Sequence, residues 1–382
     1  MWGGAVPCGE AMPALDPEMA TPVHCRLREE GVDLRLGEGV SAFQPDGFEP
    51  DGGGLRVRTA VGGDYPADLV VLAIGVKPET SLARAAGLEV GDLGGLRVDA
   101  RMRTSDPHIW AVGDVVEVRH VVTGRPALLP LAGPANRQGR IAADSIFGRR
   151  SRFRGVQGTS VCGLFGMTMA VTGASESLLR RCGMAFERIY LHPGHHVGYY
   201  PGSRPIDVKL LFAPQDGRIL GAQAVGWEGV DKRIDVIAAA IQSRMTVYDL
   251  EESELCYAPQ FGAAKDPVNV SGMIAANALR GDAPVSSWEE VLAGQDEGAL
   301  LIDVRDEDEF AAGHVEGAIN LPLHQLRGRL DELPRHRRLE IYCLVGHRGY
   351  YATRLLRLHG FDARNVSGGY KTWRQMEALC GE

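Results

Sequence analysis

Apolar residues near the C-terminus follow first a strand pattern and then a helical one. A strand ends at Tyr342, and a helix is predicted beyond it by four apolar residues at helical spacing, Tyr351, Leu355, Leu356 and Leu358. Residues 342–349, Tyr-Cys-Leu-Val-Gly-His-Arg-Gly, therefore form a loop that leads into the N-terminus of a helix. At such an end, free backbone N–H groups and the helix dipole favour an anion.

This loop contains one cysteine, Cys343, and one arginine, Arg348. A thiolate at Cys343 would be stabilised by the backbone N–H groups, by Arg348 and by the neighbouring His347. A lone cysteine is otherwise most often a buried structural residue. The loop taken alone leaves both interpretations open, so its flanking sequence has to decide between them.

Two other apolar segments predict buried strands that end in glycine. Residues 69–78 carry Gly75, and glycine there lets a ligand approach the backbone closely, although a plain buried strand fits equally well. Residues 104–114 end in Gly113 and Asp114. A carboxylate at the end of a strand can accept hydrogen bonds from sugar-like hydroxyls, or it can simply cap a helix.

Further helices and strands follow these two segments. A helix is predicted to start near Ala132 and Gly133 and to run through Ile146, with its positive N-terminus facing whatever lies in front of it. Two alternating strands around Asp216 and Gly217 predict a β-hairpin. The remaining predicted elements are short strands within 159–174 and 185–189 and a helix at 230–242.

Composition narrows the class of protein. A length of 382 residues predicts two or three domains, and 45% hydrophobic with 24% charged residues is typical of a globular protein. The net charge of −8 argues against nucleic acid as a partner. The sequence shows no apolar run long enough for a membrane helix and no secretory signal. Seven scattered cysteines suggest neither a disulfide framework nor a metal site, and a cytoplasmic protein is predicted.

The C-terminal motifs agree with one another in order and spacing. They are Leu301–Arg305, Glu309-Phe310, the turn Gly313–Pro322, and the closing Gly368-Gly369-Tyr370 and Trp373. Together with the loop they resemble a rhodanese domain over residues 286–382. The resemblance implies that Cys343 carries a sulfane sulfur as a persulfide and that Arg348 orients the loop or an anionic donor. Gly349 stands where that family often has serine or threonine.

The preceding segments resemble the flavin-dependent pyridine nucleotide–disulfide oxidoreductases, above all coenzyme A-disulfide reductases, NADH oxidases and persulfide reductases. The resemblance implies FAD and NAD(P)H as cofactors. By it, Asp114 holds the FAD ribityl chain, Gly113 permits close approach, and Gly75 faces the nicotinamide nucleotide. The helix that begins at Ala132 and Gly133 would direct its dipole at the flavin.

The resemblance also implies a homodimer. The segment 257–269 matches the part that reaches the partner subunit's active site, which makes Tyr257 a candidate to meet the sulfur of coenzyme A or of a small disulfide or persulfide. An aromatic residue that anchors a loop against the core is an equally good interpretation of Tyr257.

The expected fold class is α/β, with partial Rossmann-like nucleotide-binding domains, an α+β dimerisation domain and a C-terminal α/β rhodanese domain. The expected limits are 1–95 for the C-terminal part of the nicotinamide domain, 96–152 for a returning FAD-domain segment, 153–282 for dimerisation and 286–382 for the rhodanese-like domain.

No Gly-x-Gly-x-x-Gly turn occurs in the sequence. The sequence is therefore interpreted as N-terminally truncated, or as the partner of a separate N-terminal polypeptide, and weak FAD binding by this chain alone is expected. Two functions follow from the motifs: a flavin-linked reductase of coenzyme A disulfide or persulfide fused to a sulfur carrier, or a sulfurtransferase whose oxidoreductase part is structural. A flavin absorbance band would distinguish them.

Overall fold

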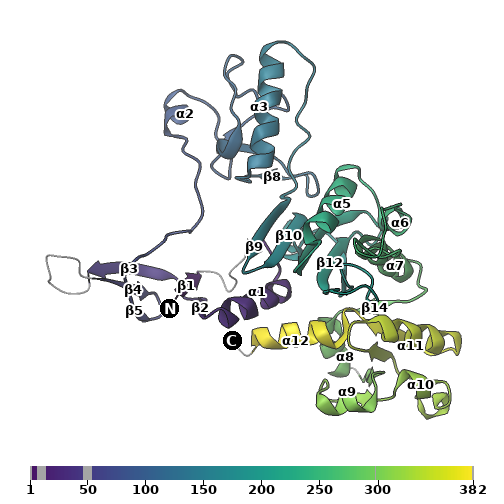
Figure 1. The fold of residues 1–382 in the computed structure, drawn as a ribbon. Coiled ribbons are helices and arrows are strands. Elements are labelled where there is room, and N and C mark those ends of the chain that lie inside the picture. Colours follow the sequence, from purple (N-terminus) through teal and green to yellow (C-terminus); the bar gives the residue numbers. More distant parts are fainter. Residues whose placement is uncertain (1, 7–13, 46–53, 297, 381–382) are drawn as a thin grey trace.

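The computed structural model describes residues 2–6, 14–45, 54–296 and 298–380 of the chain (Figure 1). The central part is a five-stranded antiparallel sheet in the order β11-β12-β13-β10-β9. Its strands are β9 (Ser160–Leu164), β10 (Met167–Gly173), β11 (Glu187–Leu191), β12 (Ile206–Phe212) and β13 (Ile219–Gly226). β12 and β13 are joined through Gly217 at φ +72°, which confirms the predicted hairpin.

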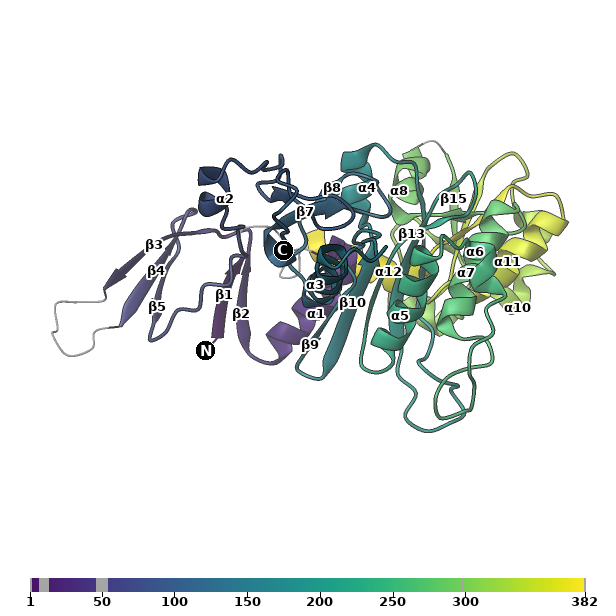
Figure 2. The same cartoon turned by 90° about the horizontal axis from the view of Figure 1, so that it is seen from above.

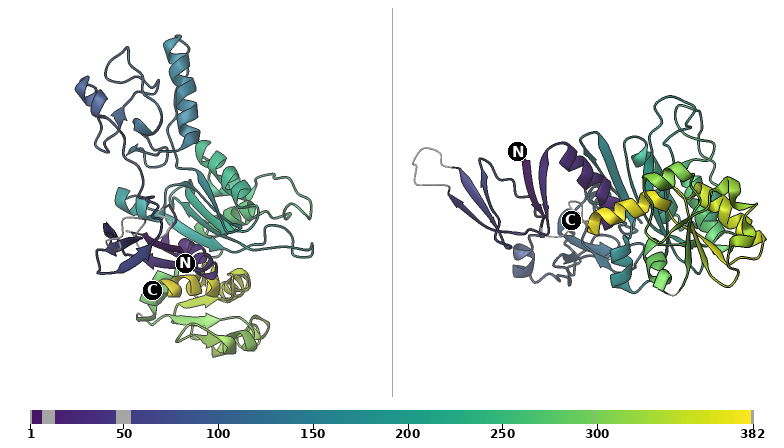
Figure 3. Two further views of the ribbon diagram at one scale, coloured as in Figure 1. Left: turned by 60° about the vertical axis from the view of Figure 1, so that its left-hand side comes forward. Right: turned by 90° about the horizontal axis from the view of Figure 1, so that it is seen from below.

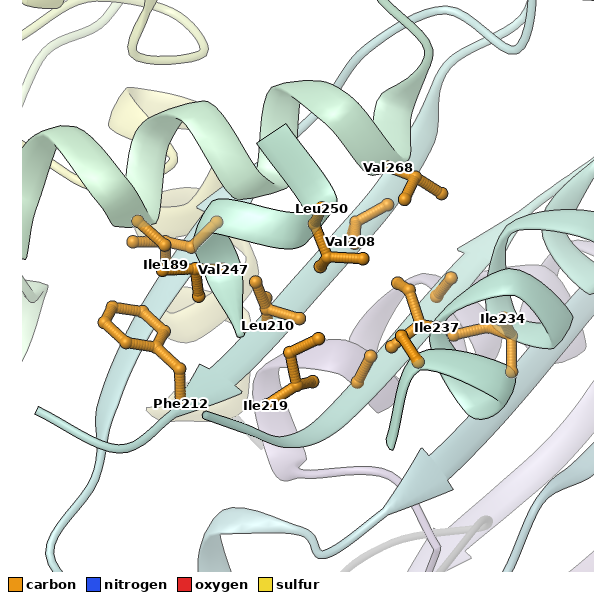
Figure 4. Close-up of a cluster of buried hydrophobic side chains, with 14 of the residues drawn as sticks. Ile189, Val208, Leu210, Phe212, Ile219, Ile234, Ile237, Val247, Leu250 and Val268 are labelled. Atoms are coloured by element: carbon orange, nitrogen blue, oxygen red, sulfur yellow. The ribbon is translucent and has the colours of Figure 1, made fainter. Parts of the chain in front are cut away.

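Three helices cover one face of this sheet: α5 (Val230–Gln242), α6 (Val247–Glu251) and α7 (Pro267–Leu279). Apolar side chains from alternate positions of β12 and from these helices meet in the largest buried cluster, part of which is drawn in Figure 4. Val208, Leu210 and Phe212 are buried in this cluster together with residues such as Ile237 and Leu250. Burying side chains of this size stabilises the fold by about 1.5–3 kcal/mol each.

The other face of the sheet is covered as well. Helix α1 (Pro17–Glu29) packs there through Met19 and Val23, and α4 (Glu176–Cys182) through Leu179. Helix α12 (Gly369–Cys380), from the far end of the chain, lies alongside α1 (Figures 1 and 2). Both faces of β12 are therefore buried along its whole length.

Residues from Val285 onward form a separate parallel sheet in the order β14-β18-β17-β15-β16. Helices lie on both sides of it (Figure 3). Its strands are β14 (Val285–Ser286), β15 (Leu300–Asp303), β16 (Ile319–Asn320), β17 (Leu339–Tyr342) and β18 (Ala363–Val366). Its helices are α8 (Trp288–Asp296), α9 (Glu307–Ala312), α10 (Leu323–Leu326), α11 (His347–Leu358) and α12, with a 3-10 turn at Leu330–Glu332. The predicted strand end at Tyr342 and the helix beyond it are confirmed.

The N-terminal part is more open. Strands β1 (Trp2–Val6) and β2 (Val32–Leu36) pair in parallel, with α1 connecting them. An antiparallel sheet of β3 (Val40–Pro45), β4 (Leu55–Thr59) and β5 (Asp64–Ala67) follows, and then the short helix α2 (Ser81–Ala85).

The prediction of a buried strand at 69–78 is wrong. These residues pair with no strand in the described part of the chain, and Leu69 and Ile74 are 79% and 80% exposed. A strand requires neighbours that satisfy its backbone groups and cover its side chains. Neither is present beside this segment among the described residues.

A small unit follows, built around β6 (Leu96–Arg97), β7 (Val116–Arg119), β8 (Pro126–Ala127) and helix α3 (Ala132–Ile146). The predicted helix through Ile146 is confirmed, but the predicted strand at 104–114 is wrong. There Arg103 and Trp110 form only an isolated bridge. Ile109 and Val112 remain partly exposed, since no adjacent described strand covers them.

Among the residues that the structure describes, no helix has the length and apolar character needed to cross a membrane.

Candidate functional site

The Cys343 loop joins β17 to α11 at the carboxyl edge of the parallel sheet. Cys343 is only 1% exposed, and the Gly346 N–H points at its sulfur from 3.2 Å. Gly346 adopts φ +94°, which turns the chain into α11 directly beneath the thiol. The thiol thus lies beside the N-terminus of α11, where the sequence predicts it.

Several backbone N–H groups of this loop are unsatisfied. Within the described part of the chain, the N–H groups of Leu344, Val345 and His347 have no acceptor. Groups of this kind at a helix N-terminus attract negative charge. A thiolate or persulfide on Cys343, whose sulfur accepts the Gly346 N–H, would supply negative charge within this same loop.

Two segments hold the loop from behind. Helix α12 donates its Tyr370 N–H to the Cys343 carbonyl at 2.8 Å and its Lys371 N–H to the Leu344 carbonyl at 2.9 Å. A side chain at Gly369 would come within 2.3 Å of that same Cys343 carbonyl, so only glycine allows this approach. The position of the loop therefore depends on the start of α12.

Asn365 supports the loop from β18. Its amide Nδ2 donates to the Gly346 carbonyl at 3.1 Å, and its Oδ1 is buried without a partner among the described residues. A Cβ at Gly349 would lie 2.3 Å from that Oδ1. Asn365 thus occupies the space that a side chain at position 349 would need.

We expect Gly349→Ala to destabilise the loop by about 1–3 kcal/mol, because the added methyl overpacks against Asn365. Asn365→Ser should restore much of the loss in the double variant, since the shorter side chain vacates the space. Thermal unfolding of the two single variants and the double variant measures this coupling. Strictly additive effects in the double variant would contradict the assigned contact.

Arg348 is tied to helix α9. Its guanidinium forms a two-point ion pair with Glu309, at 2.6 and 2.7 Å, and a longer contact of 3.4 Å with Asp306. The hydrogen bonds to Glu309 raise the pKa of Arg348, burial opposes them, and the nearby Cys343 adds to the rise. Arg348 thus fixes the loop against α9 and adds positive charge near the sulfur.

The start of α12 is in turn docked on the dimerisation sheet by a buried polar network. His192 contacts Asp207 at 2.7 Å through Nδ1 and Thr372 at 2.9 Å through Nε2. Gln375 donates to the other Asp207 oxygen at 2.7 Å, and Lys371 forms an ion pair with this carboxylate. The helix that holds the Cys343 loop is therefore attached to β12 through Asp207.

This network predicts a pH-dependent stability. Burial alone would raise the pKa of Asp207, but the hydrogen bonds from His192 and Lys371 outweigh it and lower the pKa from 3.8 to about 2. The folded pKa lies below the unfolded value, so the stabilisation is present above pH 3.8 and disappears as the pH falls toward 2.

We expect the chain to lose about 2 kcal/mol of unfolding free energy through this group between about pH 4 and pH 2. Asp207→Asn should lack that part of the pH dependence. Urea unfolding followed by tryptophan fluorescence at the two pH values, on both proteins, measures the difference. Equal losses in the variant and the parent would argue against the role of Asp207.

The residues expected to hold the flavin gather at the N-terminus of α3. Gly113 begins a 3-10 turn at φ +82°, and its N–H donates to the side chain of Gln138 in α3 at 2.7 Å. This bond places the exposed carboxylate of Asp114 near the first turn of the helix, where Ala132 and Gly133 are exposed. Asp114 also lines a hollow of about 310 Å³ together with residues 76–79.

Gly75 lies in the exposed 71–77 segment at the edge of this hollow, with φ +87°. It does not line the hollow itself. Asp114 and the start of α3 are therefore brought together as expected, and Gly75 is only their neighbour.

Tyr257 lies on the loop between α6 and α7 and is 45% exposed. Its hydroxyl contacts the hydroxyl of Tyr199 at 3.0 Å, and this hydrogen bond raises the pKa of Tyr257. The aromatic ring is not buried as a core anchor. Within the described residues, no hydrogen bond or ring contact joins Tyr257 to the Cys343 loop.

Sequence reasoning missed the residues that support the loop from outside it: Glu309, Asn365, Asp207 and His192. Glu309 belongs to a motif that drew attention, but its contact with Arg348 spans 39 positions. Asn365 and His192 carry no local signal at all.

Comparison with known proteins agrees with this geometry. Residues 7–138 match the model of the pyridine nucleotide-disulphide oxidoreductases, 159–266 that of the dimerisation domain of the same proteins, and 287–376 that of rhodanese-like domains. The structure superimposes on reduced CoADR-RHD from Bacillus anthracis with a TM-score of 0.93 and 42% identity, over 98% of this chain and 66% of that one.

A second solved structure, an NAD-dependent persulfide reductase from A. fulgidus, gives a TM-score of 0.86 and 36% identity over 97% of this chain and 67% of that one. The "NAD(P)H sulfur oxidoreductase (CoA-dependent)" of Pyrococcus abyssi is 35% identical over 259 residues, which are 67% of this chain and 56% of the relative. This chain thus spans little more than half the length of the curated relatives it matches.

The fold and the matched models define a chain of two oxidoreductase-family domains followed by a rhodanese-like domain. The chain belongs to the pyridine nucleotide-disulphide oxidoreductase family and carries a C-terminal rhodanese-like domain. Both resemblances predicted from the sequence, and the mixed α/β fold class, are confirmed.

Proposed function

We propose that this chain serves an FAD-dependent, NAD(P)H-linked reduction of coenzyme A disulfides or persulfides, with Cys343 as the sulfur carrier. The observation that carries the proposal is the buried Cys343 sulfur beside loop N–H groups that have no acceptor among the described residues. The printed names of the relatives supply the substrate class.

The sulfur step requires only residues of the loop. The Cys343 thiolate attacks the outer sulfur of a sulfane donor such as thiosulfate, the donor S–S bond breaks, sulfite leaves, and Cys343 becomes a persulfide. Both the thiolate and the persulfide are anions, so the same N–H groups stabilise each of them. Arg348, held by Glu309, adds positive charge and fixes the loop during the exchange.

Reduction of the persulfide consumes two electrons. The persulfide, NAD(P)H and one proton give the thiol, hydrogen sulfide and NAD(P)+. Bound FAD would supply the two-electron redox chemistry between the nicotinamide and the sulfur. In this proposal the exposed Asp114 carboxylate accepts hydrogen bonds from the ribityl hydroxyls, and the N–H groups at Ala132 and Gly133 face the flavin. Gly75, next to the hollow, lies on the nicotinamide side.

The proposal includes a homodimer formed by residues 153–282, in which Tyr257 and its partner Tyr199 face the sulfur of a small substrate across the interface. Exposed aromatic side chains near this loop support the dimer, because Tyr199 and Phe261 are 76% and 66% exposed in the single chain.

The proposed location is the cytoplasm. The thiols of Cys162, Cys182, Cys256 and Cys343 are free, and a reducing compartment keeps thiols in this state.

A sulfide-release assay tests the reductase part. Chain preloaded with sulfane sulfur is mixed with NADH and an excess of FAD, and sulfide is measured. Release that needs both FAD and NADH, and that falls in Asp114→Ala, is expected. Release that is indifferent to FAD, with a colourless protein, would leave only the sulfur-carrier function and refute the flavin-linked one.

A further inference from the structure

A second, larger hollow of about 590 Å³ shares no lining residue with the hollow at Asp114. It is formed where the small α3 unit meets the C-terminal end of α5, two elements that adjoin in Figure 1. Its volume is in the range of sites that bind small organic ligands. Neither Cys343 nor Asp114 is among the residues that line it.

Five arginines line this hollow: Arg119, Arg137, Arg152, Arg154 and Arg244. They come from four separate segments, so the fold and not the local sequence brings them together. In the part of the chain that the structure describes, no carboxylate forms an ion pair with any of these five guanidinium groups. This concentration of positive charge is set in a chain whose net charge is −8.

The one acidic residue in the lining does not neutralise them. Asp99 is already paired with Arg103, whose guanidinium nitrogens lie 3.0 and 2.9 Å from one carboxylate oxygen, and it also accepts the Arg101 and Arg103 backbone N–H groups. The five guanidinium groups are exposed and have no carboxylate partner among the described residues, so their N–H donors are available to a bound polyanion.

The rest of the lining suits an organic anion. Phe153 is buried with Arg137 stacked over its ring at 5.6 Å, and Met102 is buried beside it. Gln157 also lines the hollow and is only 6% exposed; its Oε1 has no hydrogen-bond partner among the described residues. Its Nε2 is bound to Thr159, Thr172 and the Ala238 carbonyl, which holds the side chain in place.

We propose that this hollow binds a small compound with two or more phosphate groups. Arginine guanidinium groups bind phosphate through two parallel hydrogen bonds, and several of them around one cavity favour a polyphosphate over a monophosphate. The proposed site uses none of the residues assigned above to the flavin or to the sulfur.

Calorimetric titration of the full chain with inorganic tripolyphosphate, and separately with orthophosphate, tests the site. One tripolyphosphate is expected to bind per chain, with orthophosphate at least tenfold weaker. The double variant Arg152→Gln/Arg154→Gln should weaken tripolyphosphate binding about tenfold or more, as the loss of two charge-assisted contacts implies. Arg150→Gln/Arg181→Gln removes the same charge from exposed positions outside the hollow and should change it less than about twofold.

Circular dichroism and thermal unfolding verify that both double variants are folded. Absence of saturable binding by the parent chain overturns the proposal. So does an equal loss of affinity in the two double variants, because that result would indicate attraction to the overall charge and not to this hollow.

Discussion

Replacing Cys343 with serine will abolish the uptake of sulfane sulfur while the chain stays folded. The serine hydroxyl cannot ionise near neutral pH and forms no persulfide, whereas its volume and its place beneath the Gly346 N–H are close to those of the thiol. Incubation with thiosulfate, followed by release with cyanide or a thiol, measures the uptake. We expect Cys343→Ser to take up no sulfur and to keep the cooperative thermal unfolding of the parent chain.

Two comparisons sharpen this experiment. Cys162→Ser removes an exposed free thiol on β9 and should leave the uptake unchanged. Arg348→Ala should weaken loading without abolishing it, because the loop N–H groups remain while its link to Glu309 is lost. Transfer that survives in Cys343→Ser and fails in Cys162→Ser would assign the carrier role to Cys162 and contradict the proposal.

Replacing Lys209 with methionine will be the most destabilising single change we expect outside the loop. Lys209 is fully buried in β12, and its ammonium lies 2.8, 2.6 and 2.9 Å from Asp16, Glu18 and Glu176. Burial alone would lower the pKa of Lys209, but the surrounding groups raise it well above its usual value. Removing this charge leaves three carboxylates crowded together and costs about 3–5 kcal/mol.

Urea unfolding of Lys209→Met beside Lys265→Met measures this cost, since Lys265 is exposed and its loss should change stability little. The deficit of Lys209→Met should shrink as the pH is lowered, because protonated carboxylates no longer repel one another. A deficit below about 1 kcal/mol, or one that grows toward acid pH, would contradict the assigned network.

The ion cluster around Lys209 could not be predicted from the sequence. Lys209 stands at mid-strand in an apolar run, and alternation alone would direct it toward solvent. Helices α1 and α4, which begin 192 and 33 residues before it, bring the three carboxylates that accept its hydrogen bonds. Only the tertiary fold reveals that this position is an interior ion cluster.

The Cys343 loop was predictable because its information is local. Strand end, cysteine, glycine turn and helix start lie within eight consecutive residues, so the chain conformation there is encoded where the chemistry is. The support from Asn365 and from α12 is not local, and no pattern in the sequence shows it. The same applies to Tyr257, whose contact with Tyr199 spans 58 positions.

Periodicity failed where burial depends on neighbours. Residues 69–78 read as an interior strand, yet the described structure offers them no sheet and leaves them exposed. The helical pattern after the loop was correct in type but not in face: Leu356 is buried, whereas Tyr351 and Leu358 are 52% and 79% exposed. Apolar character predicts that a residue can be buried, not which surface will cover it.

The central claim is that Cys343 carries the sulfur, and peptide mass mapping tests it most directly. The chain is treated with a sulfane donor, the thiols are blocked by alkylation, and the digested peptides are weighed. The account predicts one added sulfur atom on the peptide that contains Cys343, removable by cyanide and absent from Cys343→Ser. An added sulfur mapped to any other cysteine, with Cys343 unmodified, would contradict it.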